Sequence, residues 1–234
     1  MKKRIWELDA MRGLALLGMI GIHLVYDLVD LFGVWNWDQP QWYLLFKNNY
    51  GALFLLISGI SATLGSRPVK RGLLVFCCGF LCTGATVGMY LLGFAGKDII
   101  IYFGVLQCLG CCMMLWPLFR RANSALLAIL AFVMIALGLW LRTVGFSFPW
   151  LTALGFAPYG FASSDYFPLF PNLGYFLLGA VLGRALYAEK KSLLPRENPP
   201  AKALQWMGRK SLLIYLLHQP ILAAAVGAIA MIKG

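Results

Sequence analysis

The chain is 234 residues long, 61% of them hydrophobic and 12% charged, with a formal net charge of +11. Its mean hydropathy is +0.76, and the apolar share lies well above the roughly one-half found in soluble domains. Composition therefore excludes an ordinary soluble domain and predicts a polytopic membrane protein. A large positive charge can indicate a nucleic-acid partner, but here the basic residues collect in the loops between apolar runs. They indicate membrane topology instead, and no nucleic-acid partner is expected.

Seven apolar runs have a length suited to crossing a bilayer as helices. We expect these spans at about residues 10–32, 43–65, 72–92, 98–118, 124–145, 166–187 and 211–232. With Arg12 counted on the inner side, 16 of the 20 Lys and Arg residues fall on one side of the membrane and only four on the other, which are Lys47, Lys97, Arg142 and Lys233. Because basic loops stay in the cytoplasm, the N-terminus is predicted to be cytoplasmic. The predicted fold class is all-α, a helical bundle in the lipid bilayer.

The first apolar run keeps polar residues inside a membrane-length helix. Arg12 and His23 are eleven residues apart, so at about 100° per residue they share one helix face and lie roughly 16 Å apart along the axis. With Arg12 at the inner surface, His23 lies near the middle of a hydrocarbon core about 30 Å thick. Asp27 follows one turn later, in position to accept a hydrogen bond from the His23 imidazole. Polar groups at this depth are costly and usually face the bundle interior.

The last apolar run carries the second histidine of the chain. His218 lies eight residues after Lys210, or roughly 12 Å above the inner surface. The first and last runs have the same direction, so His23 and His218 are expected at a similar depth. A neutral imidazole beside a carboxylate suits a general base or a nucleophile. Two other interpretations are simple interhelical hydrogen bonds and ligation of a b-type haem by the pair; the haem gives no role to Arg12.

Three further stretches carry polar residues. Gln107, in the fourth run, is either an interhelical hydrogen-bond partner or part of the lining of a substrate tunnel. The segment 146–165 is apolar but interrupted by prolines, so it is expected in the outer interface or dipping into the bundle. Ser164 and Asp165 at its end either meet a polar acceptor or cap the next helix. Residues 188–209 are rich in proline and charge and are interpreted as a cytoplasmic linker, within a single domain covering 1–234.

Small residues inside the runs predict close helix packing. Ser58 and Gly59 lie on a small-residue face, and glycines four residues apart occur as Gly84 with Gly88 and as Gly179 with Gly183. All six cysteines lie in apolar runs and none has metal-ligand spacing against a histidine, so they are interpreted as packing residues. No metal site is expected.

Five sequence blocks, in order, carry a resemblance to known proteins. They are WELDAMRG at 6–13 with His23 following, FLLISGIS at 54–61, FGVLQCLG at 103–110, SSDYFPLFPNLGYFLLG at 163–179 and SLLIYLLHQPIL at 211–222. Together they resemble the bacterial proteins grouped with the catalytic domain of heparan-alpha-glucosaminide N-acetyltransferase. The resemblance covers nearly the whole chain and extends, more distantly, to the acyltransferase-3 acetylases of O-antigen and peptidoglycan.

This resemblance implies transfer of an acetyl group from cytoplasmic acetyl-CoA to an extracytoplasmic glycan or another hydroxyl- or amine-bearing acceptor. Arg12 would then bind the phosphates or position the pantetheine of acetyl-CoA, and Arg71 and Arg209 would be further phosphate contacts or topology charges only. The lysosomal enzyme has its proposed active histidine after the first helix, where residues 33–42 of this chain contain none. The catalytic role therefore falls to His23, by analogy with the acyltransferase-3 pattern.

The predicted mechanism places the chemistry in a tunnel formed by the first, second, fourth and seventh spans. The thioester reaches the midplane from inside, and His23, oriented by Asp27, deprotonates the acceptor or takes the acetyl group transiently. The candidates for stabilising the oxyanion are His218 and Ser58.

Two other function classes remain as alternatives. A proton-coupled transporter or flippase of a lipid-linked or acylated substrate would use the same buried polar groups, although no internal repeat is visible. A structural membrane subunit would use the histidines for packing alone. The expected location is the plasma or inner membrane, and assembly into a homo-oligomer is left open.

Overall fold

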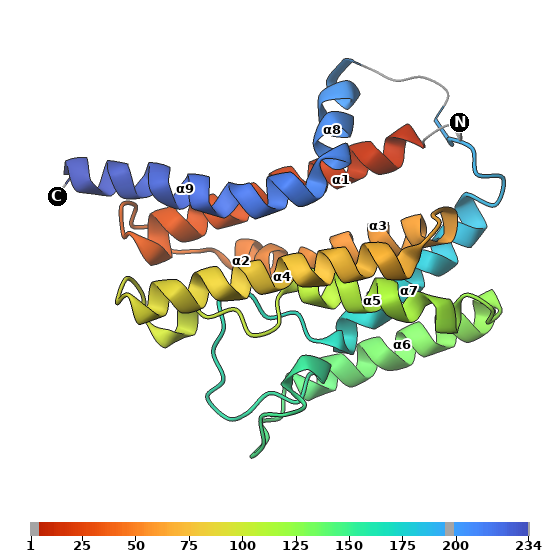
Figure 1. Ribbon diagram of the computed structural model, residues 1–234, viewed down its shortest axis with the longest axis horizontal. Helices are drawn as coiled ribbons and strands as arrows, with labels where there is room; N and C mark the ends of the chain where they lie inside the picture. Colours follow the sequence, from red (N-terminus) through yellow and green to blue (C-terminus); the bar gives the residue numbers. More distant parts are fainter. Residues whose placement is uncertain (1–4, 195–198, 234) are drawn as a thin grey trace. The chain divides into compact units, whose positions relative to one another are not determined.

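The structure is a computed structural model that describes residues 5–194 and 199–233, and its regular elements are helices (Figure 1). They are α1 (Trp6–Tyr26), α2 (Gln41–Asn49), α3 (Gly51–Leu64), α4 (Pro68–Leu91), α5 (Val105–Phe119), α6 (Ser124–Leu141), α7 (Leu169–Leu186), α8 (Pro199–Arg209) and α9 (Ser211–Lys233). Across the described residues no strand forms, so the all-α prediction is confirmed. Four basic residues used in the topology prediction, Lys2, Lys3, Arg4 and Arg196, lie outside the described residues.

Five helical segments are long and apolar enough to cross a membrane. They are Trp6–Leu31, in which α1 continues into a π-helical turn, α4, α6, α7 and Ser211–Ile232 of α9. Many of their large apolar side chains are exposed, including Leu14, Leu74, Leu81, Phe132 and Ile221. Contiguous apolar surface of this kind is a liability in water and is stable against lipid. The chain is therefore a helical membrane protein.

Two of the seven predicted spans differ from a single long helix. The run at 43–65 is divided at Tyr50 into α2 and α3. The run at 98–118 begins with a 3-10 turn, Lys97–Ile99, and becomes α-helical only at Val105. That each of these two segments crosses the membrane, giving seven crossings in all, therefore stays a prediction.

The described chain divides into two compact units, one formed by residues 1–54 and 190–234 and the other by 55–189. The first unit contains α1, α2, α8 and α9. The second contains α4 to α7 and most of α3. The single domain over 1–234 stays a prediction.

In the first unit, α8 packs directly on the N-terminal half of α1. A Cβ atom on Gly13 would lie 2.0 Å from the Leu204 carbonyl oxygen, and one on Gly208 would lie 1.8 Å from the Asp9 carbonyl oxygen. Only glycine allows backbones to approach so closely. The predicted linker 188–209 is therefore partly wrong, because its second half is a packed helix. One of the prolines that favoured a linker, Pro199, is instead the first residue of α8, a position where proline is common.

In the second unit, α3 and α7 make the same kind of contact. A Cβ on Gly59 would lie 1.9 Å from the Phe176 carbonyl oxygen, and one on Gly179 would lie 2.1 Å from the Leu56 carbonyl oxygen. The packing prediction is confirmed for these two glycines.

The equally spaced glycines of α4 behave differently. A Cβ on Gly84 or Gly88 would meet no atom of the described chain within 4 Å. The packing prediction is wrong for this pair, because a spacing of four residues does not by itself show which helix face is covered.

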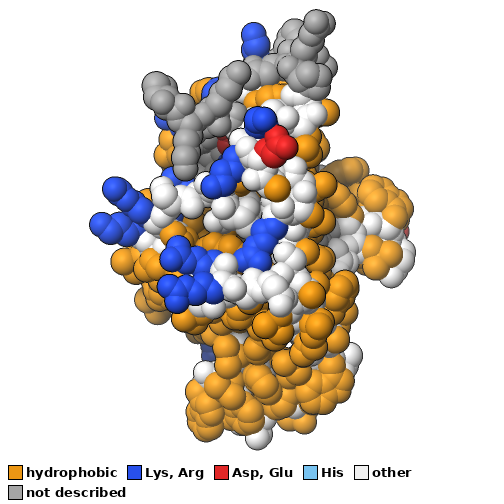
Figure 2. All heavy atoms as spheres, turned by 90° about the vertical axis from the view of Figure 1, so that its right-hand side faces the viewer, with side chains coloured by type: hydrophobic (Ala, Val, Ile, Leu, Met, Phe, Trp, Pro, Cys, Tyr) orange, Lys and Arg blue, Asp and Glu red, His pale blue; other side chains and the backbone are white. Residues whose placement is uncertain are grey.

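Basic side chains of the second unit gather where its loops meet. The Arg184 guanidinium at the end of α7 donates to the Ala122 carbonyl at 2.6 Å and to the Arg120 carbonyl at 2.8 Å. The end of α7 and the α5–α6 loop thus lie on the same side, as the topology prediction requires. Figure 2 shows a face of the molecule on which Lys and Arg side chains lie among hydrophobic ones.

Candidate active site

The two histidines of the chain lie side by side in the first unit. His23 of α1 and His218 of α9 have ring centroids 4.9 Å apart, with the ring planes at 65° to one another. His218 is 8% exposed. The prediction that these two helices bring both imidazoles to one place is confirmed, although their role in catalysis stays a prediction.

A buried carboxylate lies close along the same helix. Asp27 is fully buried and begins the π-helical turn Asp27–Leu31, an irregularity that often marks functional sites. Its Oδ1 accepts a hydrogen bond of 2.7 Å from Nε2 of Gln219 on α9. The predicted bond from His23 to Asp27 is wrong, because in the described part of the chain Asp27 is bonded to Gln219 and its Oδ2 has no partner.

Gln219 was missed by the sequence analysis. An amide next to a histidine in the middle of an apolar run is itself a signal, since polar groups at that depth are costly. The structure shows what the signal means: Gln219 joins α9 to the buried carboxylate of α1. It therefore belongs with His23, Asp27 and His218 in the candidate site.

The residues predicted to bind acetyl-CoA on the inner side begin with Arg12. Its guanidinium pairs with the Asp9 carboxylate one turn earlier at 2.6 Å, and its side chain is 29% exposed. Arg209 is exposed at the end of α8, directly after the Gly208 that contacts α1. Both arginines thus lie where α8 crosses α1, in the same unit as the histidines.

The other predicted site residues belong to the second unit. Gln107 is buried in α5, where its Oε1 accepts from the Gly104 N–H at 2.9 Å and its Nε2 donates to the Thr83 hydroxyl of α4 at 2.9 Å. Of the two interpretations offered by the sequence, these contacts give Gln107 the interhelical role. A part in cofactor binding stays a prediction.

We expect Gln107→Leu to lower the free energy of unfolding by about 1–2 kcal/mol, because it leaves the buried Gly104 N–H without its acceptor and removes the interhelical bond to the Thr83 hydroxyl. Thermal unfolding of the purified protein in detergent measures this change. Thr83→Val, which removes only the hydroxyl, is the control and should cost less. Equal stability of Gln107→Leu and the parent protein would contradict the interpretation.

The polar end of the outer segment is tied to the loop before α5. Ser164 donates to the Ile99 carbonyl at 2.6 Å, and Asp165 Oδ2 accepts from the Val105 N–H at 3.0 Å. Asp165 therefore caps α5. The alternative that it caps the next helix is wrong, because α7 begins after Pro168 without a side-chain cap. The substrate-binding role of Ser164 and Asp165 stays a prediction.

Neighbouring aromatic groups hold the outer segment together. The Tyr166 hydroxyl donates to the Thr152 carbonyl at 2.7 Å, and burial raises the pKa of this hydroxyl to about 12. The phenol therefore stays protonated and keeps its role as a donor. The segment is compact, with the ring centroids of Phe146 and Phe156 5.0 Å apart.

Ser58 and Arg71 complete the predicted set. Ser58 is half-buried on α3, one residue before the Gly59 that contacts α7, and Arg71 is exposed in the first turn of α4. Among the described residues, no hydrogen bond joins Ser58 or Arg71 to Gln107 or Asp165 of the same unit. Their roles in substrate and cofactor binding stay predictions.

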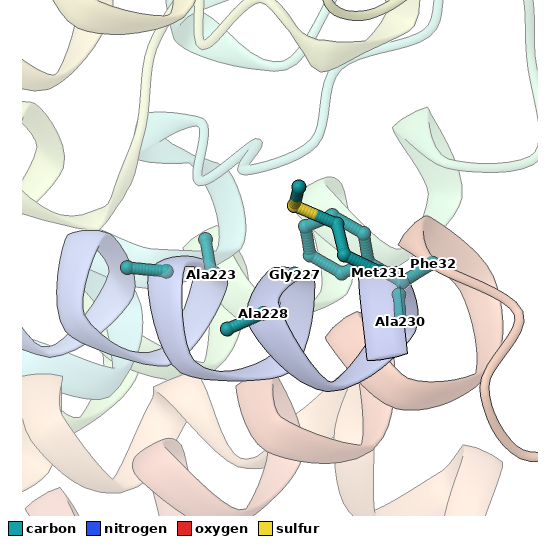
Figure 3. Close-up of a pocket in the computed structure, with 7 residues that line it drawn as sticks. Phe32, Ala223, Gly227, Ala228, Ala230 and Met231 are labelled. Carbon is teal, nitrogen blue, oxygen red and sulfur yellow. The ribbon is translucent and has the colours of Figure 1, made fainter. Parts of the chain in front are cut away.

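An apolar groove lies near the C-terminal end of the first unit. Figure 3 shows it between the last turns of α9 and Phe32, with lining residues that include Ala223, Gly227 and Met231. Among the described residues the lining of this groove is apolar and has no titratable side chain, so the groove is not part of the candidate site.

Helices apolar enough to cross a membrane, with a buried carboxylate and two adjacent imidazoles on α1 and α9, define the class of polytopic membrane proteins with a buried polar site. Comparison with known families is more specific. The model of the family described as heparan-alpha-glucosaminide N-acetyltransferase, catalytic, matches residues 4–220. The chain belongs to this family of transmembrane acetyltransferases, as its sequence blocks suggested. No curated protein and no solved structure matches it.

Proposed function

We propose that the protein is a transmembrane acyltransferase that moves an acetyl group from cytoplasmic acetyl-CoA to a glycan or another hydroxyl- or amine-bearing acceptor on the outer side. The observation that supports it most is the pair His23–His218, with ring centroids 4.9 Å apart, in a chain of an acetyltransferase family. A neutral imidazole is a suitable base for acyl transfer. A purely structural subunit has no need of two adjacent buried imidazoles.

The proposed topology follows from the charge pattern. Crossings by α1, α2–α3, α4, α5, α6, α7 and α9 place the N-terminus in the cytoplasm and the C-terminus outside, as a multi-pass protein of the plasma or inner membrane. The basic residues of the α5–α6 loop and the end of α7 meet on one side, which agrees with this arrangement. The two histidines then lie at mid-membrane depth.

The cofactor is proposed to enter from the basic side. Arg209 and Arg71 are exposed, and a guanidinium binds phosphate oxygens in pairs, so both suit the phosphates of CoA. Arg12 is already paired with Asp9, so it would contact a phosphate only by sharing its guanidinium with that carboxylate. Within the second unit, Gln107 is proposed for cofactor binding, and Ser58, Ser164 and Asp165 for acceptor binding. No metal takes part.

The test is a transfer assay with the whole chain in proteoliposomes. Acetyl-CoA carrying a labelled acetyl group is supplied on one side, and a mixture of amino sugars and neutral sugars on the other. We expect labelled, acetylated sugar to form and free CoA to appear in equal amount. Counterflow of unmodified sugar without consumption of acetyl-CoA would instead favour the transporter alternative, and absence of both would overturn the proposal.

A further inference from the structure

Three buried atoms of the candidate site have no hydrogen-bond partner. They are Oδ2 of Asp27, Nε2 of His218 and Oε1 of Gln219. Buried polar atoms are normally satisfied, so these exceptions, three of the five among the described residues, need an explanation. Two of them belong to side chains that are bonded to each other, and the third belongs to His218, whose ring packs on His23 one helical turn before Asp27.

The chemical nature of each atom follows from the partners of its neighbours. Nδ1 of His218 lies 2.5 Å from the Tyr215 carbonyl oxygen, which can only accept, so Nδ1 carries the proton and Nε2 of the neutral ring has a lone pair. An ionised Asp27 carboxylate can only accept as well, so Gln219 presents its NH₂ group to it and leaves its oxygen unpaired. All three orphan atoms are therefore acceptors.

A cluster of acceptors is complementary to a group that donates hydrogens. It fits a hydroxyl or an amine, and it repels the negative oxygen of a tetrahedral intermediate. His218 is accordingly a poor candidate for stabilising the oxyanion, the role that the sequence suggested for it. The cluster matches instead the nucleophilic group of the acceptor.

The two histidines are not equivalent in this cluster. The Tyr215 carbonyl fixes the tautomer and ring orientation of His218, as a second hydrogen bond does for many working histidines. No hydrogen bond of the described residues fixes a ring nitrogen of His23, since Asp27 is bonded to Gln219. A base works best when its lone pair is held in place.

We propose that Nε2 of His218, rather than His23, takes the proton of the acceptor, while Asp27 Oδ2 and Gln219 Oε1 bind the acceptor's remaining hydrogens or those of a neighbouring group. The inference rests on the proposed function. The acceptor oxygen or nitrogen attacks the thioester carbonyl and its proton passes to Nε2. The carbon–sulfur bond then breaks, and the CoA thiolate takes that proton from Nε2. Acetylated acceptor and free CoA leave, and His218 is neutral again.

The asparagine variants of both histidines test this assignment in the same transfer assay. His218→Asn keeps an N–H near the position of Nδ1, for the Tyr215 carbonyl, and removes Nε2. We expect it to lower kcat by about 10²- to 10⁴-fold, the usual contribution of a general base. His23→Asn should lower kcat less. An unchanged rate in His218→Asn, or a larger loss in His23→Asn, would overturn the assignment while active parent protein still supports the proposed function.

A second measurement does not depend on activity. With only two histidines in the chain, ¹⁵N spectra of histidine-labelled protein give two ring systems, assigned with the His23→Asn variant. We expect His218 to be protonated at Nδ1; a proton on Nε2 of the neutral ring would overturn the proposal. Should His218→Asn fail to fold, His218→Gln replaces it, and full activity of that variant would contradict a base at Nε2.

Discussion

Replacing Asp27 with asparagine is expected to leave the fold intact and to lower kcat/KM for acetyl transfer by about 10- to 100-fold. In the parent protein Nε2 of Gln219 donates to Asp27 Oδ1 at 2.7 Å. The asparagine amide keeps an oxygen that can accept this bond. It also turns the unpartnered acceptor Oδ2 into a donor, which opposes the hydrogens of the acceptor substrate. Loss of a hydrogen bond to a charged group costs about 1.5–3 kcal/mol, which gives the expected range.

The matched control for this variant is Asp30→Asn. Asp30 lies one turn further along the same helical segment and is exposed. Its carboxylate pairs with Lys47 at 3.6 Å and accepts a hydrogen bond from Gln39 at 3.2 Å. Ion pairs of this exposed kind contribute little, so its kcat/KM should stay within about twofold of the parent value. Equal losses in both variants would show that Asp27 acts through general charge and not through its buried position bonded to Gln219.

The largest loss of stability is expected from Gly179→Leu. Even a Cβ at this position would lie 2.1 Å from the Leu56 carbonyl oxygen, and the clash is with backbone, which cannot move aside without separating α3 from α7. Overpacking of a rigid contact costs about 1–3 kcal/mol or more. We expect little folded protein to be recovered from membranes, which size-exclusion chromatography in detergent measures directly.

Gly88→Leu provides the comparison, because a Cβ at Gly88 would meet no atom of the described chain within 4 Å. A glycine replaced on an open helix face gains helix propensity, so this variant should be recovered in amounts equal to the parent. Recovery of Gly179→Leu at the same level would mean that the α3–α7 contact does not hold the second unit together.

The convergence of the histidines was predictable because it depends on regular geometry. Rise per residue and loop charge together predict a similar depth for His23 and His218, and neither requires knowledge of packing. The partner of Asp27 was not predictable in the same way. The change from α- to π-helix at Asp27 has no clear sequence signal, and the donor comes from Gln219, 192 residues further along the chain.

The packing of α8 shows another limit of the sequence. Pro199 and the charges around it are typical of a linker, yet proline is also favoured at the first position of a helix. Likewise Gly84 with Gly88 and Gly179 with Gly183 share one spacing, and only the second pair lies against a neighbouring backbone. Whether a segment packs as a helix, and whether a glycine pair is covered, depends on which helix face meets a neighbour. That contact is set by the tertiary fold and not by the local sequence.

The glycine contact between α1 and α8 also lies a fixed number of residues from each histidine of the candidate site. Gly13 precedes His23 by ten residues, and Gly208 precedes His218 by ten residues. Inserting one residue between Lys210 and His218 would turn the second ring by about 100° about its helix axis. The number of residues between each glycine and its histidine therefore matters more than which residues they are. A redesign of these helices should keep this number unchanged.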